Sequence, residues 1–132
     1  MKKKSVLDAY ALLAYFKKEG GHARVKELLS SADTTLLVNS INLGEVFYIL
    51  ARERGIRAAE YFLGVILPGL SVSVIENSLE DVIAAARLKA EHALSFADCF
   101  AAATAIWKDA VLVTGDREFK KLGKSVRLEW ID

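Results

Sequence analysis

Four acidic residues stand where a carboxylate could take part in chemistry. Asp8 and Asp116 each follow a short apolar run that is typical of a buried strand, VLD and VLVTGD. Glu45 lies in a segment that is apolar nearly all round, where an unpaired carboxylate is costly to bury, and Asp98 lies in SFADCFAAATA. Such a cluster cannot be fully ionised without a cation, and hard oxygen ligands suit Mg²⁺ or Mn²⁺. The predicted chemistry is metal-assisted hydrolysis of a phosphodiester bond.

Two of these carboxylates are predicted to meet at one edge of a sheet. The carboxyl ends of parallel strands share an edge, where open α/β sheets bind ligands, so Asp8 and Asp116 should converge there. Thr114 could hold a carboxylate or a water molecule through its hydroxyl. The structural alternative for both acids is a turn former or a helix N-cap. Our hypothesis is that the TGD turn places Asp116 beside a metal ion shared with Asp8 and Asp98.

The other two acids also have structural alternatives. Asp98 follows Ser95 by three residues, so SFAD could form a capping box at the start of a helix. The small alanines that follow Asp98 would nevertheless let this helix pack closely over the sheet edge. Glu45 could pair with Arg52, roughly two turns along the same helix. Otherwise a carboxylate on this apolar helix needs a cation.

Hydrophobic patterning predicts strands and helices in alternation. Strands are expected at residues 4–8, 34–39, 70–76, 110–115 and 126–131. Helices are expected at residues 9–21, 22–33, 40–55, 56–67, 78–92, 95–109 and 117–123. Strands that alternate with helices imply right-handed crossovers and a parallel sheet covered on both faces. The predicted fold class is therefore α/β.

Length and composition predict one domain, residues 1–132. Apolar residues make up 53% of the chain and the mean hydropathy is +0.25, which indicates buried strands and an apolar face for a dimer. The formal net charge of +1 excludes a globally basic surface of the kind that coats nucleic acid. Once an acidic pocket is neutralised by cations, the remaining surface would be modestly basic.

No pattern in the sequence predicts a secreted or membrane protein. The start MKKKSVLDAYALLAYFKK imitates a secretory signal, but Asp8 interrupts its apolar stretch. No segment is long enough to span a membrane. Cys99 is the only cysteine, and His22 and His92 lack the spacing of metal ligands. We therefore expect a cytoplasmic protein.

Four motifs occur in order along the whole chain: VLDAYALLAYF, INLGEVFYIL, SFADCFAAATA and LVTGDREF. Together they resemble the PIN-domain nucleases, and most closely the small VapC toxins of toxin–antitoxin pairs. The resemblance implies a three-layer α/β/α sandwich around a parallel sheet of roughly four to five strands. It also implies a ribonuclease that uses Mg²⁺ or Mn²⁺, cleaves RNA, forms a homodimer and is blocked by a small VapB-like antitoxin.

The resemblance also assigns roles to particular residues. The positions of the family's catalytic and metal-binding acids are, in chain order, Asp8, Glu45, Asp98 and Asp116. The hydroxyl of the last motif falls on Thr114, which would support these acids. Two neighbours depart from the pattern, because Tyr10 stands where many members have serine and Asn42 where many have threonine. The departures concern the surroundings of the metal ligands rather than the ligands.

Basic residues follow the last acid directly. Arg117 and Lys120, with Lys121 beside them, could hold the phosphates of an RNA backbone near the site. The structural alternative is that these charges form the solvated face of a short helix. No residue in this segment predicts which RNA sequence is read.

Other functions on a parallel sheet fit the sequence less well. A receiver domain needs an aspartate after its third strand and a lysine after its last, but here the third strand ends SVIEN and no lysine follows AVLVTG directly. A haloacid-dehalogenase-type phosphatase needs a second aspartate where Tyr10 stands. Two alternatives stay open: a PIN nuclease that processes RNA outside a toxin pair, and a PIN scaffold that binds RNA or protein without cleaving.

Overall fold

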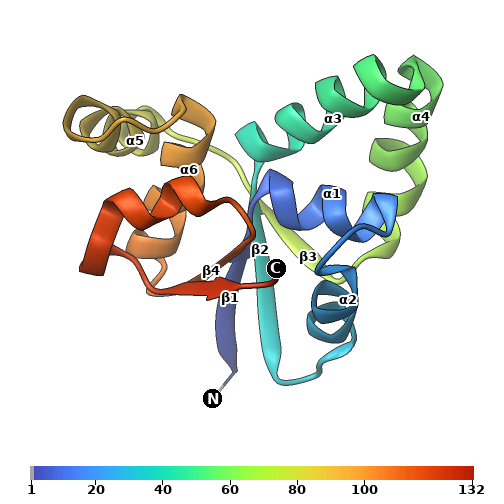
Figure 1. Ribbon diagram of the computed structural model, residues 1–132, viewed down its shortest axis with the longest axis horizontal. Coiled ribbons are helices and arrows are strands. Elements are labelled where there is room, and N and C mark those ends of the chain that lie inside the picture. Colours follow the sequence, from blue (N-terminus) through green and yellow to red (C-terminus); the bar gives the residue numbers. More distant parts are fainter. Residues whose placement is uncertain (1) are drawn as a thin grey trace.

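Five strands pair in one parallel sheet in the computed structural model, which describes residues 2–132. They are β1 (Lys3–Leu7), β2 (Thr34–Asn39), β3 (Val72–Ile75), β4 (Val111–Thr114) and β5 (Leu128–Trp130). The order across the sheet is β3-β2-β1-β4-β5, so β1 is the central strand. Because all pairs are parallel, the carboxyl ends of the strands lie at one edge, the upper edge for β1 and β2 in Figure 1.

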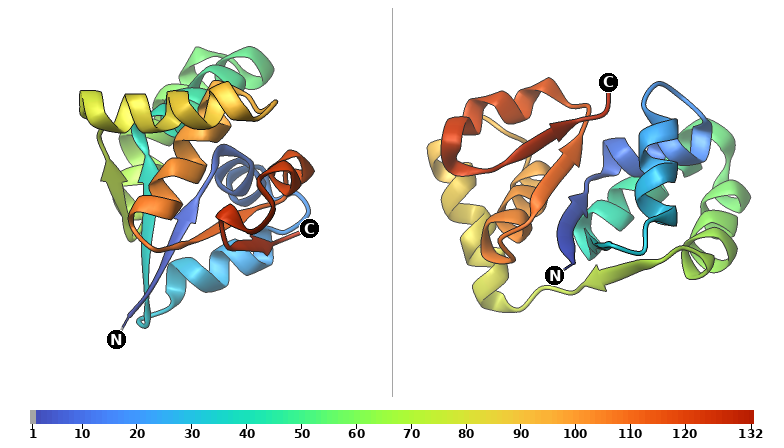
Figure 2. Two further views of the ribbon diagram at one scale, coloured as in Figure 1. Left: turned by 90° about the vertical axis from the view of Figure 1, so that its left-hand side faces the viewer. Right: turned by 90° about the horizontal axis from the view of Figure 1, so that it is seen from below.

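Helices cover both faces of this sheet. They are α1 (Ala9–Lys17), α2 (His22–Ser30), α3 (Ser40–Arg54), α4 (Ile56–Tyr61), η1 (Phe62–Ile66), η2 (Leu67–Gly69), α5 (Leu79–Glu91), α6 (Phe96–Trp107) and η3 (Arg117–Ser125). The helices α1 to α4 lie on one side of the sheet and α5 and α6 on the other (Figures 1 and 2). The predicted α/β/α sandwich is therefore confirmed. Within residues 2–132, no helix combines the length and the apolar character needed to cross a bilayer.

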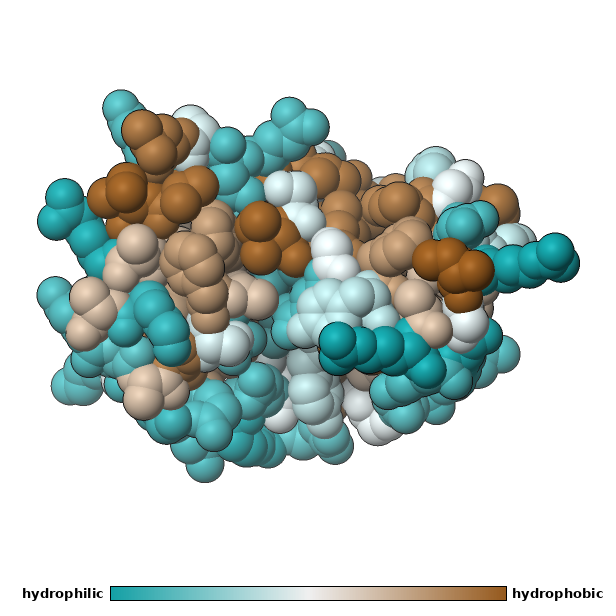
Figure 3. Space-filling view, turned by 90° about the horizontal axis from the view of Figure 1, so that it is seen from above, coloured by the Kyte–Doolittle hydropathy of each residue, from teal (hydrophilic) through white to brown (hydrophobic). Residues whose placement is uncertain are grey.

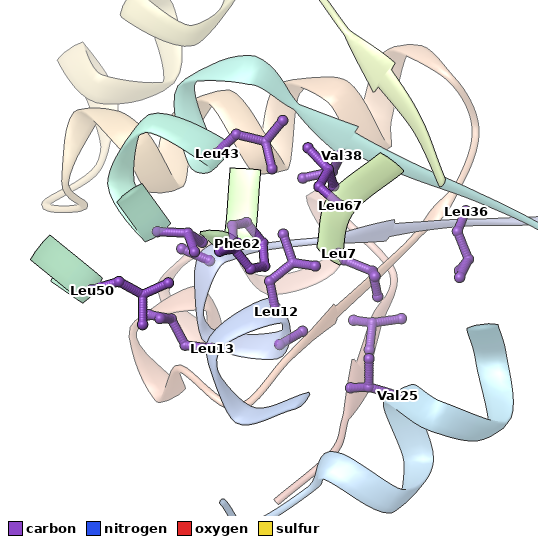
Figure 4. Close-up of a cluster of buried hydrophobic side chains, with 14 of the residues drawn as sticks. Leu7, Leu12, Leu13, Val25, Leu36, Val38, Leu43, Leu50, Phe62 and Leu67 are labelled. Carbon is purple, nitrogen blue, oxygen red and sulfur yellow. The ribbon is translucent and has the colours of Figure 1, made fainter. Parts of the chain in front are cut away.

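The carboxyl-terminal halves of β1 and β2 and most of β4 are buried and largely apolar, because helices cover both faces of the centre of the sheet. Successive residues of a strand point to opposite faces. On β1, Val6 packs into the cluster that includes Phe100 of α6, whereas Leu7 packs into the cluster that includes Leu12 of α1 and Phe62 of η1. Figure 4 shows the second cluster. Two cores thus hold the central strand from both sides and fix the position of its carboxyl end.

Two predicted helices take other forms. The predicted helix at residues 56–67 begins as α4, continues as a π-helical turn and ends in a 3₁₀ turn that contains Pro68. Proline has no amide hydrogen and clashes with the preceding turn, so an α-helix cannot continue through it unchanged. The last helix, η3, is 3₁₀ and is interrupted at Gly123, where φ is +58°. The differences arise at a proline and at a glycine with a positive φ, and the spacing of apolar residues does not reveal either effect.

A polar network fixes the carboxyl ends of β2 and β3. The amide of Asn39 donates to Asn77 Oδ1 and to Thr104 Oγ1, each at 2.9 Å. The amide of Asn77 donates to Asn39 Oδ1 at 2.9 Å and to Ser40 Oγ at 3.1 Å. Because Asn39 is the last residue of β2 and Thr104 lies on α6, the network ties the sheet edge to the helix that carries Asp98. The sequence analysis did not identify this network.

Candidate metal centre at the sheet edge

Asp8 occupies the carboxyl end of the central strand and is almost fully buried, with 2% of its surface exposed. Its Oδ1 accepts a hydrogen bond from the Ala11 amide at 2.8 Å, which caps α1. Its Oδ2 accepts a hydrogen bond from the hydroxyl of Thr114. Both oxygens are thus held by donors from two elements, and the carboxylate has a fixed orientation.

Thr114 connects Asp8 to the second acid of the edge. It is the last residue of β4 and is fully buried. While its hydroxyl donates to Asp8, its Oγ1 accepts a hydrogen bond from the Asp116 amide at 2.9 Å. Asp116 Oδ1 in turn accepts from the Glu118 amide at 3.0 Å, which caps η3. Asp8 and Asp116 therefore act as helix N-caps, as the structural alternative predicted. They also converge at one edge of the sheet, because both are hydrogen-bonded to Thr114.

Glu45 and Asp98 reach the same edge from helices. Glu45 lies on α3, which follows β2, and Asp98 lies in the first turn of α6. The charge of Asp116 raises the pKa of both, and the charge of Glu45 raises the pKa of Asp98, so the three carboxylates are neighbours. The charges of Asp98 and Asp116 likewise raise the pKa of Asp8. All four acids that the sequence singled out thus face the same edge of the sheet, and each influences the pKa of at least one other or is influenced by it.

The structural alternatives for the two helical acids have different outcomes. In α6, Ser95 Oγ accepts from the Asp98 amide at 3.1 Å, so Ser95 caps this helix, but no hydrogen bond from the Ser95 amide to the Asp98 carboxylate completes a capping box between these described residues. The alternative ion pair between Glu45 and Arg52 does not form between these two described residues. The Arg52 guanidinium lies instead over the Tyr48 ring, 5.1 Å from its centre. Tyr48 lies one turn before Arg52 on α3, and Glu45 has no cationic partner among residues 2–132.

Burial and mutual repulsion favour the protonated forms of these acids. Burial raises the pKa of Asp8 from 3.8 to about 7, the charges of Asp98 and Asp116 add to this, and the Thr114 and Ala11 hydrogen bonds oppose it. The pKa of Asp98 rises from 3.8 to about 7, through burial and then through Asp116 and Glu45. Burial also raises the pKa of Glu45. A cation among these groups would reverse the balance and favour their ionised forms.

The donor set fits a hard divalent cation. Carboxylate oxygens are the ligands that Mg²⁺ and Mn²⁺ prefer, and Glu45 Oε1 is a buried acceptor without a hydrogen-bond partner among the described residues. Within residues 2–132, no three His, Cys, Asp or Glu side chains already stand close enough together to hold one ion. Since like charges repel, small side-chain rotations would have to accompany binding. Asp8, Glu45, Asp98 and Asp116 are the residues that could hold the ion.

Tyr10 shapes the TGD turn in a way that the sequence analysis did not foresee. A Cβ atom placed on Gly115 would overlap the Tyr10 ring, so the ring lies directly against the backbone between Thr114 and Asp116. The Tyr10 hydroxyl donates to Asp132 Oδ2 at 2.7 Å. The backbone of Gly115 lies outside the left-handed region, so its conformation alone does not require glycine.

The basic residues that follow Asp116 differ in how far they are engaged. Arg117 donates to the Asp132 carbonyl and lies over the Trp130 ring, 4.4 Å from its centre. Lys121 pairs with Glu118 and donates to a backbone carbonyl. Lys120 is exposed and makes no hydrogen bond or ion pair with the part of the chain that the structure describes. Lys120 is therefore the most available cation of this segment.

Comparison with known proteins identifies one matching family. A family model described as "PIN domain" matches residues 5–125. Comparison with curated proteins finds no match.

Solved structures share the fold over nearly the whole chain. VapBC2 from Rickettsia felis, bound to a DNA fragment from its promoter, aligns with a TM-score of 0.76 at 24% identity over 98% of this chain and 99% of that chain. The sarcin-ricin loop cleaving toxin VapC20 of Mycobacterium tuberculosis aligns with a TM-score of 0.75 at 22% identity, covering 90% and 95%. DNA-bound VapBC from Salmonella typhimurium aligns with a TM-score of 0.73 at 23% identity, covering both chains fully at 100%.

The raised pKa values predict how the stability of the metal-free protein depends on pH. An acid whose pKa is raised on folding stabilises the protein fully below its unfolded pKa, and this contribution is lost as pH rises through the folded value. In EDTA, the free energy of unfolding should therefore fall between about pH 4 and about pH 7. The Asp98→Asn variant should show a shallower fall and exceed the wild type in stability at about pH 8.

Urea unfolding in EDTA across this pH range measures the effect. Asp33→Asn is the matched control, because Asp33 is exposed and lies just before β2, at the opposite end of that strand from the site. Parallel curves for the wild type and Asp98→Asn would contradict the repulsion inferred from the carboxylate cluster.

Proposed function

The chain belongs to the PIN-domain family, and from this premise we propose that it is a Mg²⁺- or Mn²⁺-dependent ribonuclease and the toxin of a type II toxin–antitoxin pair. The observation that carries the proposal is the gathering of Asp8, Glu45, Asp98 and Asp116 at one sheet edge, where burial and mutual repulsion raise the pKa of three of them. We propose that residues 1–132 form one such nuclease domain. An RNA substrate implies a cytoplasmic site of action.

In the proposed mechanism, the acidic edge holds the cation and the scissile phosphate. A divalent ion bound there supplies Lewis acidity, lowers the pKa of a water molecule and stabilises the leaving oxygen. Asp8, Asp98 and Asp116 would bind the ion, and Thr114 holds Asp8 in the orientation that it needs. Glu45 Oε1, a buried acceptor without a partner among the described residues, would be the group that receives the proton of the attacking water.

We propose that Lys120 and Arg117 hold the RNA backbone beside the acids. Lys120 is exposed and free to meet a phosphate. The Arg117 guanidinium uses one nitrogen for the Asp132 carbonyl and stacks on Trp130, which leaves further N–H groups available. Cations flanking an acidic pocket would direct the phosphates toward the metal while the carboxylates themselves repel them.

The toxin role rests on the structural neighbours. The VapBC structures from Rickettsia felis and Salmonella typhimurium contain DNA, and VapC20 from Mycobacterium tuberculosis is described as a toxin that cleaves the sarcin-ricin loop. By analogy, we propose a small VapB-like antitoxin as the cognate partner of this chain. A PIN nuclease that processes RNA outside a toxin pair, or a PIN scaffold that does not cleave, is the alternative outcome of the experiments below.

We also propose that the chain forms a homodimer. Ala85 is the only fully buried residue of α5, whereas Leu79 and Ile83 on the same helix are 77% and 43% exposed. On α3, Ile41 and Tyr48 are exposed as well. Seen from above, apolar side chains gather on the side of α5 and on the side of α3 (Figure 3). A second copy would remove these apolar surfaces from water.

Removal of the metal ligands should abolish RNA cleavage. With a mixed RNA substrate and Mn²⁺, the Asp8→Asn, Asp98→Asn double variant should cleave at least about 100-fold more slowly than the wild type, and EDTA should stop the wild type. Asp33→Asn, an exposed aspartate near the opposite edge of the sheet, is the matched control and should cleave normally. Cleavage that survives EDTA or the double variant would refute the metal mechanism, and a wild type that binds Mn²⁺ without cleaving would favour the scaffold.

Loss of one phosphate contact should weaken RNA binding in a salt-dependent way. In the inactive double variant, Lys120→Ala should reduce the slope of log affinity against log salt by about 1, because one fewer counterion is released. Lys26→Ala is the control, since Lys26 is exposed on α2. Equal slopes for both lysine variants would remove Lys120 from the proposed RNA-binding surface.

A charge placed on α5 should separate the proposed dimer. The wild type should sediment at twice the chain mass of 14.5 kDa. Ile83→Asp should raise the dissociation constant of the dimer by about 100-fold or more, because a buried unpaired carboxylate is costly. Val65→Asp, at an exposed apolar position of η1, should remain dimeric. A dimer that tolerates Ile83→Asp must use another surface, and a monomeric wild type would exclude the homodimer.

A further inference from the structure

Asn42 is a buried polar residue beside the site that the proposed mechanism does not use. It lies on α3, one turn before Glu45, and none of its surface is exposed. Burying an amide without satisfying its hydrogen bonds is costly, so buried amides normally have partners for both ends. The surroundings of Asn42 therefore indicate what its side chain does.

The nitrogen end of this amide connects the two helices of the site. Asn42 Nδ2 donates to the Ala97 carbonyl at 3.1 Å. Ala97 directly precedes Asp98, so this bond joins the turn of α3 that carries Glu45 to the turn of α6 that carries Asp98. Because the hydrogen bond requires the nitrogen to face Ala97, it also fixes which way the amide is turned.

The oxygen end of the amide has no partner. Asn42 Oδ1 and Glu45 Oε1 are both buried acceptors that receive no hydrogen bond from the described residues. Asn42 and Glu45 are neighbours on the surface of α3, because they are three residues apart on one helix. Two buried acceptors one helical turn apart, without donors among residues 2–132, would both be satisfied by the water molecules of a hydrated cation.

We propose that Asn42 is a positioning residue of the metal centre. Its nitrogen fixes the spacing between Glu45 and Asp98 through Ala97, and its Oδ1 accepts a hydrogen bond from the hydration shell of the cation. A small divalent ion that keeps several of its waters provides such donors, and groups that bind those waters or orient the ligands tune metal affinity. The inference rests on the metal site of the proposed function.

Threonine and valine at position 42 separate hydrogen bonding from packing, because these side chains have the same shape and differ only in the hydroxyl. Mn²⁺ titration of the full chain by calorimetry should give Asn42→Val a dissociation constant about 10-fold to 100-fold above that of the wild type. Asn42→Thr, which keeps a donor and an acceptor, should recover most of this loss. Thr34→Val is the control: it removes a hydrogen-bonding hydroxyl from the first residue of β2, at the opposite end of that strand from the acids, and should not change the affinity of the folded protein for Mn²⁺.

The stability of each variant in EDTA distinguishes positioning from structural support. If Asn42 only held the fold together, Asn42→Val would lose stability but bind Mn²⁺ as tightly as the wild type once folded, and the inference would be overturned. If Asn42→Val does not fold, the serine and alanine variants provide the same comparison. A wild type that binds Mn²⁺ but does not cleave RNA would refute the nuclease and leave the affinity test valid, whereas absence of Mn²⁺ binding would overturn both proposals.

Discussion

Burial of the Asp8 carboxylate at the end of the central strand is the constraint on which the other features of the site depend. A carboxylate in this position is tolerated because the Ala11 amide and the Thr114 hydroxyl each donate to one of its oxygens. Thr114 can do so only because β4 is the neighbour of β1, and it then accepts from the Asp116 amide. The strand order, the cap of α1 and the TGD turn are thus parts of one arrangement.

Two apolar cores make this arrangement rigid, and the acidic edge acts against it. The cores pack against β1 from both faces. The carboxylates of Glu45 on α3, Asp98 on α6 and Asp116 just before η3 repel one another across the edge. Part of the free energy gained by packing the two apolar cores therefore offsets the repulsion among these carboxylates. A cation would convert that repulsion into attraction, so the same side chains oppose the metal-free fold and stabilise the metal-bound one.

Features with a regular period or a strong local chemical preference could be predicted from the sequence. The five strands were identified because buried β-branched runs alternate with helical spacing, and Asp8 and Asp116 were placed together because parallel strands share an edge. The network around Asn39 and the role of Tyr10 could not be predicted. Each depends on residues far apart in the chain, and neither leaves a periodic signal. The sequence left open an ion pair between Glu45 and Arg52, and helix spacing alone did not reveal that the Arg52 guanidinium lies over the Tyr48 ring instead.

The contact between the Tyr10 ring and Gly115 links two positions that are 105 residues apart in the chain. Glycine in a turn is usually explained by its backbone freedom, but here the backbone would accept other residues and the aromatic ring is what excludes them. Each position therefore limits the other: a side chain larger than hydrogen at position 115 needs a smaller residue than tyrosine at position 10, or a displaced ring.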